Sequence, residues 1–464
     1  MDDASTTEQY RRALEAAHRE ALRWLDSLPD RPIRPEADAD AILARLERTL
    51  PETGASPTAV VQELAEAAEP GLIALGSPRF FGLVIGGTYP AALAADWLAS
   101  AWDQNNGARQ LTPATAAVEE VAAAWLLELL GLPAGSGVGF VTGGTMANFA
   151  CLVAARDEVV RRAGGDPAAG LQRAPEVRFL AGGAVHTSMV LAGRLAGLGA
   201  PRTVGADDQG RIDVAGLERA LAEATGPAVV ALQAGDVHSG DFDDFVGAVE
   251  VAHRAGAWVH VDGAFGLWAA VSPRLQHLVR GMADADSWAT DAHKTLNVPY
   301  DCGVAIVADE AAMTAALGAH APYLPAVTGV SDPYDRVPEF SRRARGVSVW
   351  AALRALGRRG VVGLVDGLAD AAAALADGFR TVAGLEVLND VVFTQVCLAA
   401  GDDAQTAALG EWLRAEGTAW ASSSTWRGRT VLRFAVSNHG TDADAVRRTV
   451  DAVRRGAAAL AIGG

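Results

Sequence analysis

The chain of 464 residues carries 39 basic and 56 acidic side chains, a net charge of −17, and half of its residues are hydrophobic. This length and apolar content exclude a disordered or fibrous protein and predict a large buried core. The acidic balance argues against nucleic acid or an anionic membrane as a partner. Three separated cysteines, no targeting peptide at the start and no long apolar run together predict a cytoplasmic protein without a disulfide framework or a metal site.

In chain order, the pattern first predicts helices. Apolar residues recur at helical spacing over 7–28 and 57–68, and a further helix is predicted over 90–102. From about residue 114, helices alternate with short apolar strands, as in βαβ units with a mostly parallel sheet. These strands are predicted at residues 139–142, 178–181, 228–233, 258–261, 287–289 and 304–307.

The last part of the chain predicts a smaller α+β unit. Its elements are helices over 351–356 and 361–383 and strands near 391–399 and 430–436. The preceding segment 318–340 has four prolines and no periodicity, which predicts a long functional loop. We therefore divide the chain into a helical segment 1–104, a large domain 105–350 and a small domain 351–464.

Composition singles out one residue. Of the 39 basic residues 38 are arginine, and the only lysine is Lys294. Arginine can replace lysine in surface charges, helix ends and ion pairs, but a guanidinium cannot deprotonate and attack a carbonyl. Lys294 is therefore predicted to form a Schiff base, and the alternative is that it persists by chance.

The segment WVHVDGAFG, residues 258–266, predicts a buried strand that ends at Asp262. Open α/β sheets bind ligands at this carboxyl edge. A buried carboxylate there needs a cationic partner, unless Asp262 only caps the next turn. Lys294 follows another short strand, so both side chains can face one cavity. Pyridoxal phosphate would use both, because the lysine binds its aldehyde and an aspartate keeps its pyridine nitrogen protonated.

Two predicted helix starts add further groups. GFVTGGTMAN places the backbone N–H groups of Gly144 and Thr145, and the Thr145 hydroxyl, at a helix N-terminus that suits a phosphate. An ordinary strand-to-helix connection with Thr145 as its cap would give the same pattern. His186 in AVHTS begins a helix after another strand, where the imidazole can stack on a pyridine ring or cap the helix.

Together these motifs resemble the group II pyridoxal-phosphate-dependent amino-acid decarboxylases, over about residues 79–450. The motifs that carry the resemblance are WVHVDGAFG, ADSWATDAHKTLNVPYDCG, GGTMAN, AVHTS and SRRARGVSVWAALRALGRRG. The resemblance implies an α/β fold of the aspartate-aminotransferase type (fold type I) and a homodimer with active sites at the subunit interface. It also implies roles for single residues: Lys294 as the Schiff-base lysine, Asp262 as the pyridinium partner, His186 as the stacking imidazole, Ala264 beneath the ring, and Gly144, Thr145 and His293 around the phosphate.

The predicted activity is that of an L-amino-acid decarboxylase that releases CO2 and an amine. The same cofactor site can instead serve aldehyde synthesis, aldol-type cleavage or transamination, or belong to a non-catalytic relative. The chain departs from better-known relatives at Asp236 and His238, where uncharged polar residues are usual, and at Met146, where an acidic residue is frequent. The resemblance therefore does not identify the amino-acid substrate.

Two further residues are predicted to act on the substrate. Arg433 lies between apolar neighbours in RTVLRFAVSNH, where a substrate carboxylate or a structural ion pair would offset the cost of burial. The segment DPYDRVPEFSRRARGVSVW resembles the mobile catalytic loop of the decarboxylases and puts Tyr334 where a tyrosine protonates Cα. Tyr323 in APYLP is the alternative, and either tyrosine can instead simply pack the loop.

Overall fold

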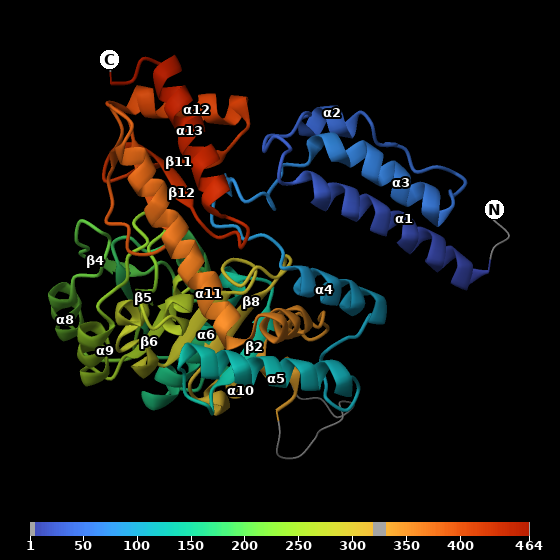
Figure 1. Ribbon diagram of the computed structural model, residues 1–464. Coiled ribbons are helices and arrows are strands. Elements are labelled where there is room, and N and C mark those ends of the chain that lie inside the picture. The colour runs from blue at the N-terminus through green and yellow to red at the C-terminus, as the bar shows by residue number, and fades with distance from the viewer. Residues whose placement is uncertain (1–4, 319–330, 464) are drawn as a thin grey trace.

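The computed structural model describes residues 5–318 and 331–463 (Figure 1). The chain begins with helices α1 (Thr6–Ser27), α2 (Ala39–Leu43), α3 (Pro57–Ala68) and α4 (Pro90–Trp102). Helices α1 and α3 lie side by side and project away from the rest of the molecule, as Figure 1 shows. Their starts follow from sequence, because the Ser5 and Ser56 side chains accept hydrogen bonds from the first turns and Pro57 begins α3. Within the described residues, none of the helices combines the length and the apolar character needed to cross a bilayer.

A seven-stranded sheet forms the centre of the molecule, in the order β2-β8-β7-β6-β5-β3-β4. Every neighbouring pair is parallel except those of β8, which runs antiparallel to β2 and β7. The strands are β2 (Gly137–Val141), β3 (Arg178–Gly182), β4 (Arg202–Val204), β5 (Ala228–Gln233), β6 (Trp258–Asp262), β7 (Ser287–Asp291) and β8 (Gly303–Val307). Apart from β4, they match the predicted strands, and the mostly parallel α/β fold predicted from the sequence is confirmed.

Helices cover both faces of this sheet, and every residue of β2, β5, β6, β7 and β8 is buried. The helices are α5 (Pro113–Leu130), α6 (Gly144–Arg162), α7 (Thr187–Leu195), α8 (Val214–Ala222), α9 (Phe245–Arg254) and α10 (Glu310–Leu317). Helix α6 packs across β6, β7 and β8, and its N-terminus lies at the carboxyl ends of the parallel strands β6 and β7. The sheet is thereby built to place loop residues and one helix start at a common edge.

A second sheet has the order β1-β11-β12-β10-β9 and lies near the C-terminus (Figure 1). Its elements are β1 (Phe80–Phe81), β9 (Glu386–Val387), β10 (Gln395–Ala399), β11 (Trp420–Trp426), β12 (Arg429–Ala435), α12 (Asp403–Glu416) and α13 (Ala443–Ala459). The predicted irregular stretch around residue 80 contributes β1, which pairs in parallel with β11. Part of the segment 1–104 thus belongs to the C-terminal sheet, and the domain division stays a prediction.

Helix α11 (Gly346–Arg380) connects the two sheets, as the long orange helix in Figure 1 shows. The sequence predicted two helices here, over 351–356 and 361–383. The chain does leave helical geometry between them, at Gly357 with φ 59°. That value lies in the left-handed region that glycine adopts without strain. The predicted interruption is therefore real, although it is a kink in one long helical element.

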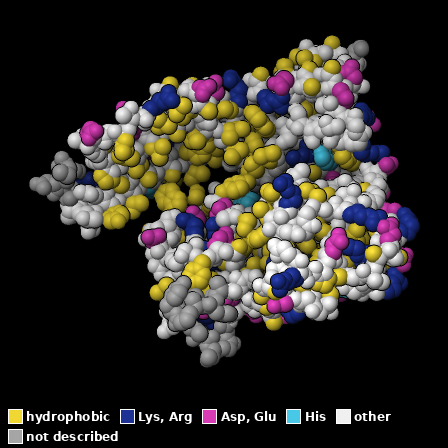
Figure 2. All heavy atoms as spheres, turned by 180° about the vertical axis from the view of Figure 1, so that it is seen from behind, with side chains coloured by type: hydrophobic (Ala, Val, Ile, Leu, Met, Phe, Trp, Pro, Cys, Tyr) yellow, Lys and Arg dark blue, Asp and Glu magenta, His cyan; other side chains and the backbone are white. Residues whose placement is uncertain are grey.

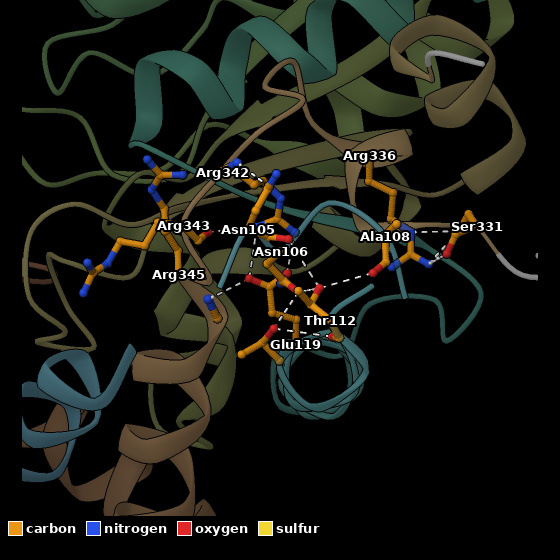
Figure 3. Close-up of polar contacts among 12 residues, drawn as sticks. Asn105, Asn106, Ala108, Thr112, Glu119, Ser331, Arg336, Arg342, Arg343 and Arg345 are labelled. Atoms are coloured by element: carbon orange, nitrogen blue, oxygen red, sulfur yellow. Dashed lines mark hydrogen bonds and ion pairs between the residues drawn. The ribbon is translucent and has the colours of Figure 1, made fainter. Parts of the chain in front are cut away.

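The described part of the predicted loop 318–340 is not irregular throughout. Pro333–Arg336 forms a short 3-10 helix. Beyond it, Arg342 Nη1 donates to Glu119 Oε1 of α5 over 3.0 Å, and the Gly346 N–H donates to the same oxygen over 3.0 Å (Figure 3). The Arg342 and Glu119 side chains are 2% and 5% exposed. This buried ion pair fixes the segment before α11 against α5.

Candidate active site

A cavity of about 490 Å³ opens at the carboxyl ends of β5, β6 and β7, beside the start of α6. It brings together eight of the nine predicted site residues: Gly144, Thr145, His186, Asp262, Ala264, His293, Lys294 and Arg433. A further wall comes from Leu83, Val84 and Ile85, which follow β1. Residues from the N-terminal segment, the central sheet and the C-terminal sheet therefore meet at one site.

Asp262 ends β6 and its carboxylate lies at the inner side of the cavity. Asn148 Nδ2 donates to Asp262 Oδ2 over 2.9 Å, and the Ala264 N–H donates to Oδ1 over 3.1 Å. Burial raises the pKa of Asp262, and the charge of Lys294 and the hydrogen bond from Asn148 oppose this. A buried carboxylate is stabilised as an anion by a cation in contact with it, so Asp262 is suited to hold a protonated nitrogen in the cavity.

A chain of buried polar groups, which the sequence did not reveal, orients the Asp262 carboxylate through its hydrogen bond with Asn148. His260 Nε2 donates to Asn148 Oδ1 over 3.0 Å, and His260 Nδ1 lies 2.9 Å from Ser287 Oγ. Burial lowers the pKa of His260 to about 3, so this imidazole is neutral. A neutral donor fixes the Asn148 amide so that its NH2 group faces the carboxylate. The alternating pattern of WVHVD, with a histidine facing the same way as Asp262, was the available hint.

Lys294 projects into the cavity and is paired with a residue that the sequence analysis missed. Lys294 Nζ lies 2.9 Å from Oδ2 of Asp291, the last residue of β7. The Lys294 side chain is 20% exposed and that of Asp291 only 3%. The amine is therefore open to a ligand while its counter-ion is buried.

The start of α6 offers an uncapped helix N-terminus to the cavity. Gly143 is the N-cap and no side chain accepts from the first turn, so the alternative of a Thr145 cap is wrong. A Cβ on Gly144 would lie 2.8 Å from Asp291 Oδ2, so a larger residue there would displace the Asp291 carboxylate. The free N–H groups and the helix dipole favour an anion at this point. His293 lies beside it, with Nδ1 accepting from the Cys302 N–H over 3.2 Å.

His186 both caps a helix and lines the cavity. It is the N-cap of α7, where its Nδ1 accepts from the Ser188 N–H over 3.2 Å. The backbone N–H of His186 donates to Gln233 Oε1 over 3.1 Å. Burial lowers the pKa of His186, and the nearby Lys294 charge adds to this. The imidazole is therefore neutral at neutral pH and can present a flat face to a ring.

Arg433 comes from β12 and reaches the cavity from the second sheet. Its Nη1 donates to the carbonyl oxygens of Leu83 and Val237, each over 3.0 Å. In the described part of the chain no carboxylate lies within ion-pair distance of it, so the alternative of a structural ion pair receives no support. Burial lowers the pKa of Arg433, a cost that an anionic ligand would offset.

Asp236 and His238, which distinguish this chain from the family pattern, do not line the cavity. The Asp236 carboxylate accepts from the backbone N–H groups of His238 and Ser239, which closes a turn. His238 Nε2 lies 2.9 Å from Ser424 Oγ, and its ring stacks on Trp426 of β11. These residues join the two sheets, while their neighbours Gly235 and Val237 face the cavity.

Tyr334 is the predicted site residue that the structure does not bring to the cavity. It is 4% exposed, its N–H donates to Gly107 O over 3.0 Å, and its ring stacks on Phe340 at 4.9 Å. In this arrangement the phenol packs within the described end of the predicted loop 318–340 and does not line the cavity that holds Lys294. Its role as a proton donor stays a prediction that this geometry does not support. Tyr323 lies outside the described residues.

This set of groups fits pyridoxal phosphate. An aldehyde can react with the amine of Lys294, a pyridine nitrogen can meet Asp262, and a phosphate can meet the uncapped start of α6. A family described as the pyridoxal-dependent decarboxylase conserved domain matches residues 40–400. The chain belongs to this family. It is thus a pyridoxal-phosphate-dependent carboxy-lyase of the amino-acid decarboxylase class, with the fold type I architecture expected of it.

Individual relatives agree with this assignment. Tryptophan decarboxylase 1 of Oryza sativa subsp. japonica is 29% identical over 468 residues, which cover 93% of this chain and 90% of the relative. The crystal structure of Oryza sativa TDC with PLP and tryptamine has a TM-score of 0.92 at 26% identity and covers 99% of both chains. The crystal structure of Rhodiola rosea 4-hydroxyphenylacetaldehyde synthase has a TM-score of 0.88 at 21% identity over 99% of both chains, a likeness of fold.

Proposed function

We propose that the protein is an L-amino-acid decarboxylase that releases CO2 and an amine, with Lys294 as the Schiff-base lysine. The observation that carries this proposal is that the only lysine of the chain and the buried carboxylate of Asp262 line one cavity. Bound pyridoxal phosphate supplies an electron sink for the electron pair that remains when CO2 leaves. The protein must bind the cofactor, orient the substrate and control protons around it.

Each residue has one task in this proposal. The Lys294 amine holds the cofactor through its aldehyde carbon until the substrate amine replaces it. Asp262, fixed by Asn148, holds a proton at the pyridine nitrogen and keeps the ring positively charged. The neutral imidazole of His186 packs on one ring face, and Ala264 leaves room on the other.

The anionic groups of cofactor and substrate have separate binding groups. The N–H groups at Gly144 and Thr145, together with His293, bind the phosphate of the cofactor. Arg433 binds a substrate carboxylate from the opposite wall of the cavity, because its guanidinium is the buried cation there without a carboxylate partner in the described residues. Separate sites for the two anions set the orientation of the substrate relative to the ring.

A cytoplasmic location stays a prediction. We also infer that the protein forms a homodimer, as the family resemblance implies. Large apolar side chains are exposed on α1, α3 and α4: Tyr10, Leu14, Leu22, Val60, Leu64, Trp97, Leu98 and Trp102. Figure 2 shows hydrophobic side chains gathered along the projecting N-terminal segment and around the hollow beneath it. Apolar surface of this extent is typical of a protein interface, and a second copy is the partner we propose. Light scattering on the eluting protein should give twice the mass of 47.9 kDa.

The catalytic proposal is tested by trapping the cofactor. Borohydride reduction of the loaded protein should remove its yellow colour and leave a phosphopyridoxyl adduct on Lys294, which peptide mass spectrometry locates. Lys294→Arg should keep the charge, bind no cofactor covalently and lose turnover. Incubation with each of the twenty amino acids, with release of CO2, amine and aldehyde measured, then identifies the substrate and the product. An aldehyde in place of an amine would contradict the proposed outcome but not the Schiff base.

A further inference from the structure

Asp291 is a buried charged residue in the cavity to which the proposed function gives no task. Its Oδ2 lies 2.9 Å from Lys294 Nζ. Its Oδ1 is buried and has no hydrogen-bond partner in the described residues. His293 Nε2 lies 3.6 Å from Oδ1, which is too far for a hydrogen bond. Lys294 is therefore the group that balances the charge of this carboxylate.

The same carboxylate also lies against the phosphate side of the cavity. The space at the Cα of Gly144, where α6 begins, is closed by Asp291 Oδ2, since an added Cβ would approach it to 2.8 Å. Gly144 is among the residues proposed to bind the phosphate of the cofactor. A carboxylate and a phosphate at one end of one helix repel each other, and the repulsion is strong where water is excluded.

Binding of an aldehyde removes the partner of Asp291. Condensation joins the Lys294 nitrogen to the aldehyde carbon, breaks the C=O bond and releases its oxygen as water, so the ammonium must first give up a proton to solvent. The carboxylate then faces the phosphate with the Lys294 nitrogen bound to the aldehyde carbon and no longer free to pair with it as an ammonium. The other titratable groups near Asp291 are His293, Tyr300 and Cys302. Burial lowers the pKa of His293 and raises that of Tyr300 to about 12, so both are neutral at neutral pH. Burial also raises the pKa of Cys302, so its thiol is neutral as well.

We propose that Asp291 is a positioning residue that holds the Lys294 side chain in an ion pair in the cofactor-free protein and weakens the binding of the cofactor through its phosphate. This inference rests on the proposed function. The carboxylate keeps the amine ordered and unreactive until the cofactor enters. It also makes cofactor binding weaker and more easily reversed than it would be with an amide at position 291.

The reactivity of Lys294 tests the first half without any cofactor. Because the chain has one lysine, an amine-directed reagent such as trinitrobenzenesulfonate reports on Lys294 alone once the modified peptide is separated from the N-terminus. Asp291→Asn keeps the shape and removes the charge. At neutral pH it should speed modification of Lys294 in the cofactor-free protein by about threefold or more, since the ammonium loses its partner. An unchanged rate would overturn the proposal.

The second half of the proposal, weaker binding through the phosphate, is tested by comparing two aldehydes, one with the phosphate and one without it. Dissociation constants of pyridoxal phosphate and of pyridoxal are measured by absorbance for the wild type and for Asp291→Asn. The preference for the phosphate form should rise by about tenfold in the variant. Asp262→Asn is the matched control, because its carboxylate lies at the other end of the cofactor site, and it should change both constants by the same factor.

Several outcomes separate this inference from the proposed function. Equal changes for both aldehydes in Asp291→Asn, or a selective loss of affinity for pyridoxal phosphate, would overturn the inference while the Schiff base at Lys294 stands. Failure of either aldehyde to attach to Lys294 in the wild type would overturn the proposed function, whatever the modification rates are. Asp291→Ser, with its fold checked by circular dichroism, repeats the test should the amide disturb packing against Gly144.

Discussion

The Nδ2 of Asn148 donates to Oδ2 of Asp262 over 2.9 Å, which joins the start of α6 to the end of β6. The two residues are 114 positions apart in the chain. The same helix presents its free N-terminal N–H groups to the cavity. Helix α6 therefore positions both the group proposed to meet the pyridine nitrogen and the groups proposed to meet the phosphate. Because the strand and the helix are packed against each other, the spacing of the two cofactor contacts is fixed before the cofactor arrives.

Asp262→Asn should keep the shape of the site and remove the charge that holds the pyridine nitrogen protonated. A loss of about 4 to 6 kcal/mol of transition-state stabilisation would lower the turnover number by several orders of magnitude. Steady-state kinetics measures this, and absorbance of the bound cofactor shows separately that the variant is loaded. Wild-type turnover would mean that another acid meets the nitrogen.

Arg433→Lys should raise the KM for the substrate about tenfold or more, with a smaller effect on kcat. A single ammonium cannot form the two parallel hydrogen bonds that a guanidinium makes with a carboxylate. Arg429→Lys is the matched control, since Arg429 lies on the same strand and pairs with Glu386 at the surface. An unchanged KM for Arg433→Lys, with a lowered melting temperature, would indicate that Arg433 only supports the carbonyl groups of Leu83 and Val237.

Arg342→Met should destabilise the fold, because it leaves the buried carboxylate of Glu119 without its cation (Figure 3). Removal of one partner of a buried ion pair costs about 3 to 5 kcal/mol. Urea denaturation of the variant should therefore show a much lower midpoint than the wild type. Arg358→Met breaks the exposed pair with Glu128 and should cost less than about 1 kcal/mol. Equal effects of the two variants would show that the buried pair contributes no more than a surface pair.

Tyr334→Phe should leave the ratio of amine to aldehyde unchanged, because the tyrosine packs on Phe340 outside the cavity. Product analysis by chromatography under air, with the wild type in parallel, checks this. A shift from amine towards aldehyde would restore the sequence prediction that Tyr334 delivers a proton to the substrate carbon, and would require the segment to move.

The parts of the fold that the sequence predicted are those determined by local pattern. Strand β5 is an apolar run up to its last residue, β6 starts with apolar residues that alternate with His260, and Pro57 and Pro90 mark helix starts. Strand β11 escaped prediction because WASSSTW has three serines and a threonine in succession and no apolar run. Strand β1 has two residues, and only its pairing with β11 makes it a strand.

The residues of the candidate site also fall into those that the sequence predicted and those that it did not. Lys294 was found because it is the only lysine of the chain, and Asp262 because it ends a strand that the sequence predicts to be buried. Asn148 and Asp291 were not found from the sequence, because an amide in a helix and an acid three residues before a lysine are common in any sequence. Their importance depends on distances of 2.9 Å that only the packed chain creates. Tyr334 was assigned by aligning a loop with no periodicity, and such an alignment has nothing to fix its register.

The pairing of β1 with β11 also determines when the cavity can exist during synthesis. The Leu83 N–H donates to Ser422 Oγ, 339 positions later in the chain, and the Leu83 carbonyl accepts from Arg433. In a nascent chain, residues 80–85 therefore stay unpaired until nearly the whole protein has left the ribosome. Closing a loop of this length is slow, and the apolar stretch is open to wrong partners in the meantime. A chain that stops before residue 420 lacks β11 and β12, and with them Arg433 and one wall of the active site.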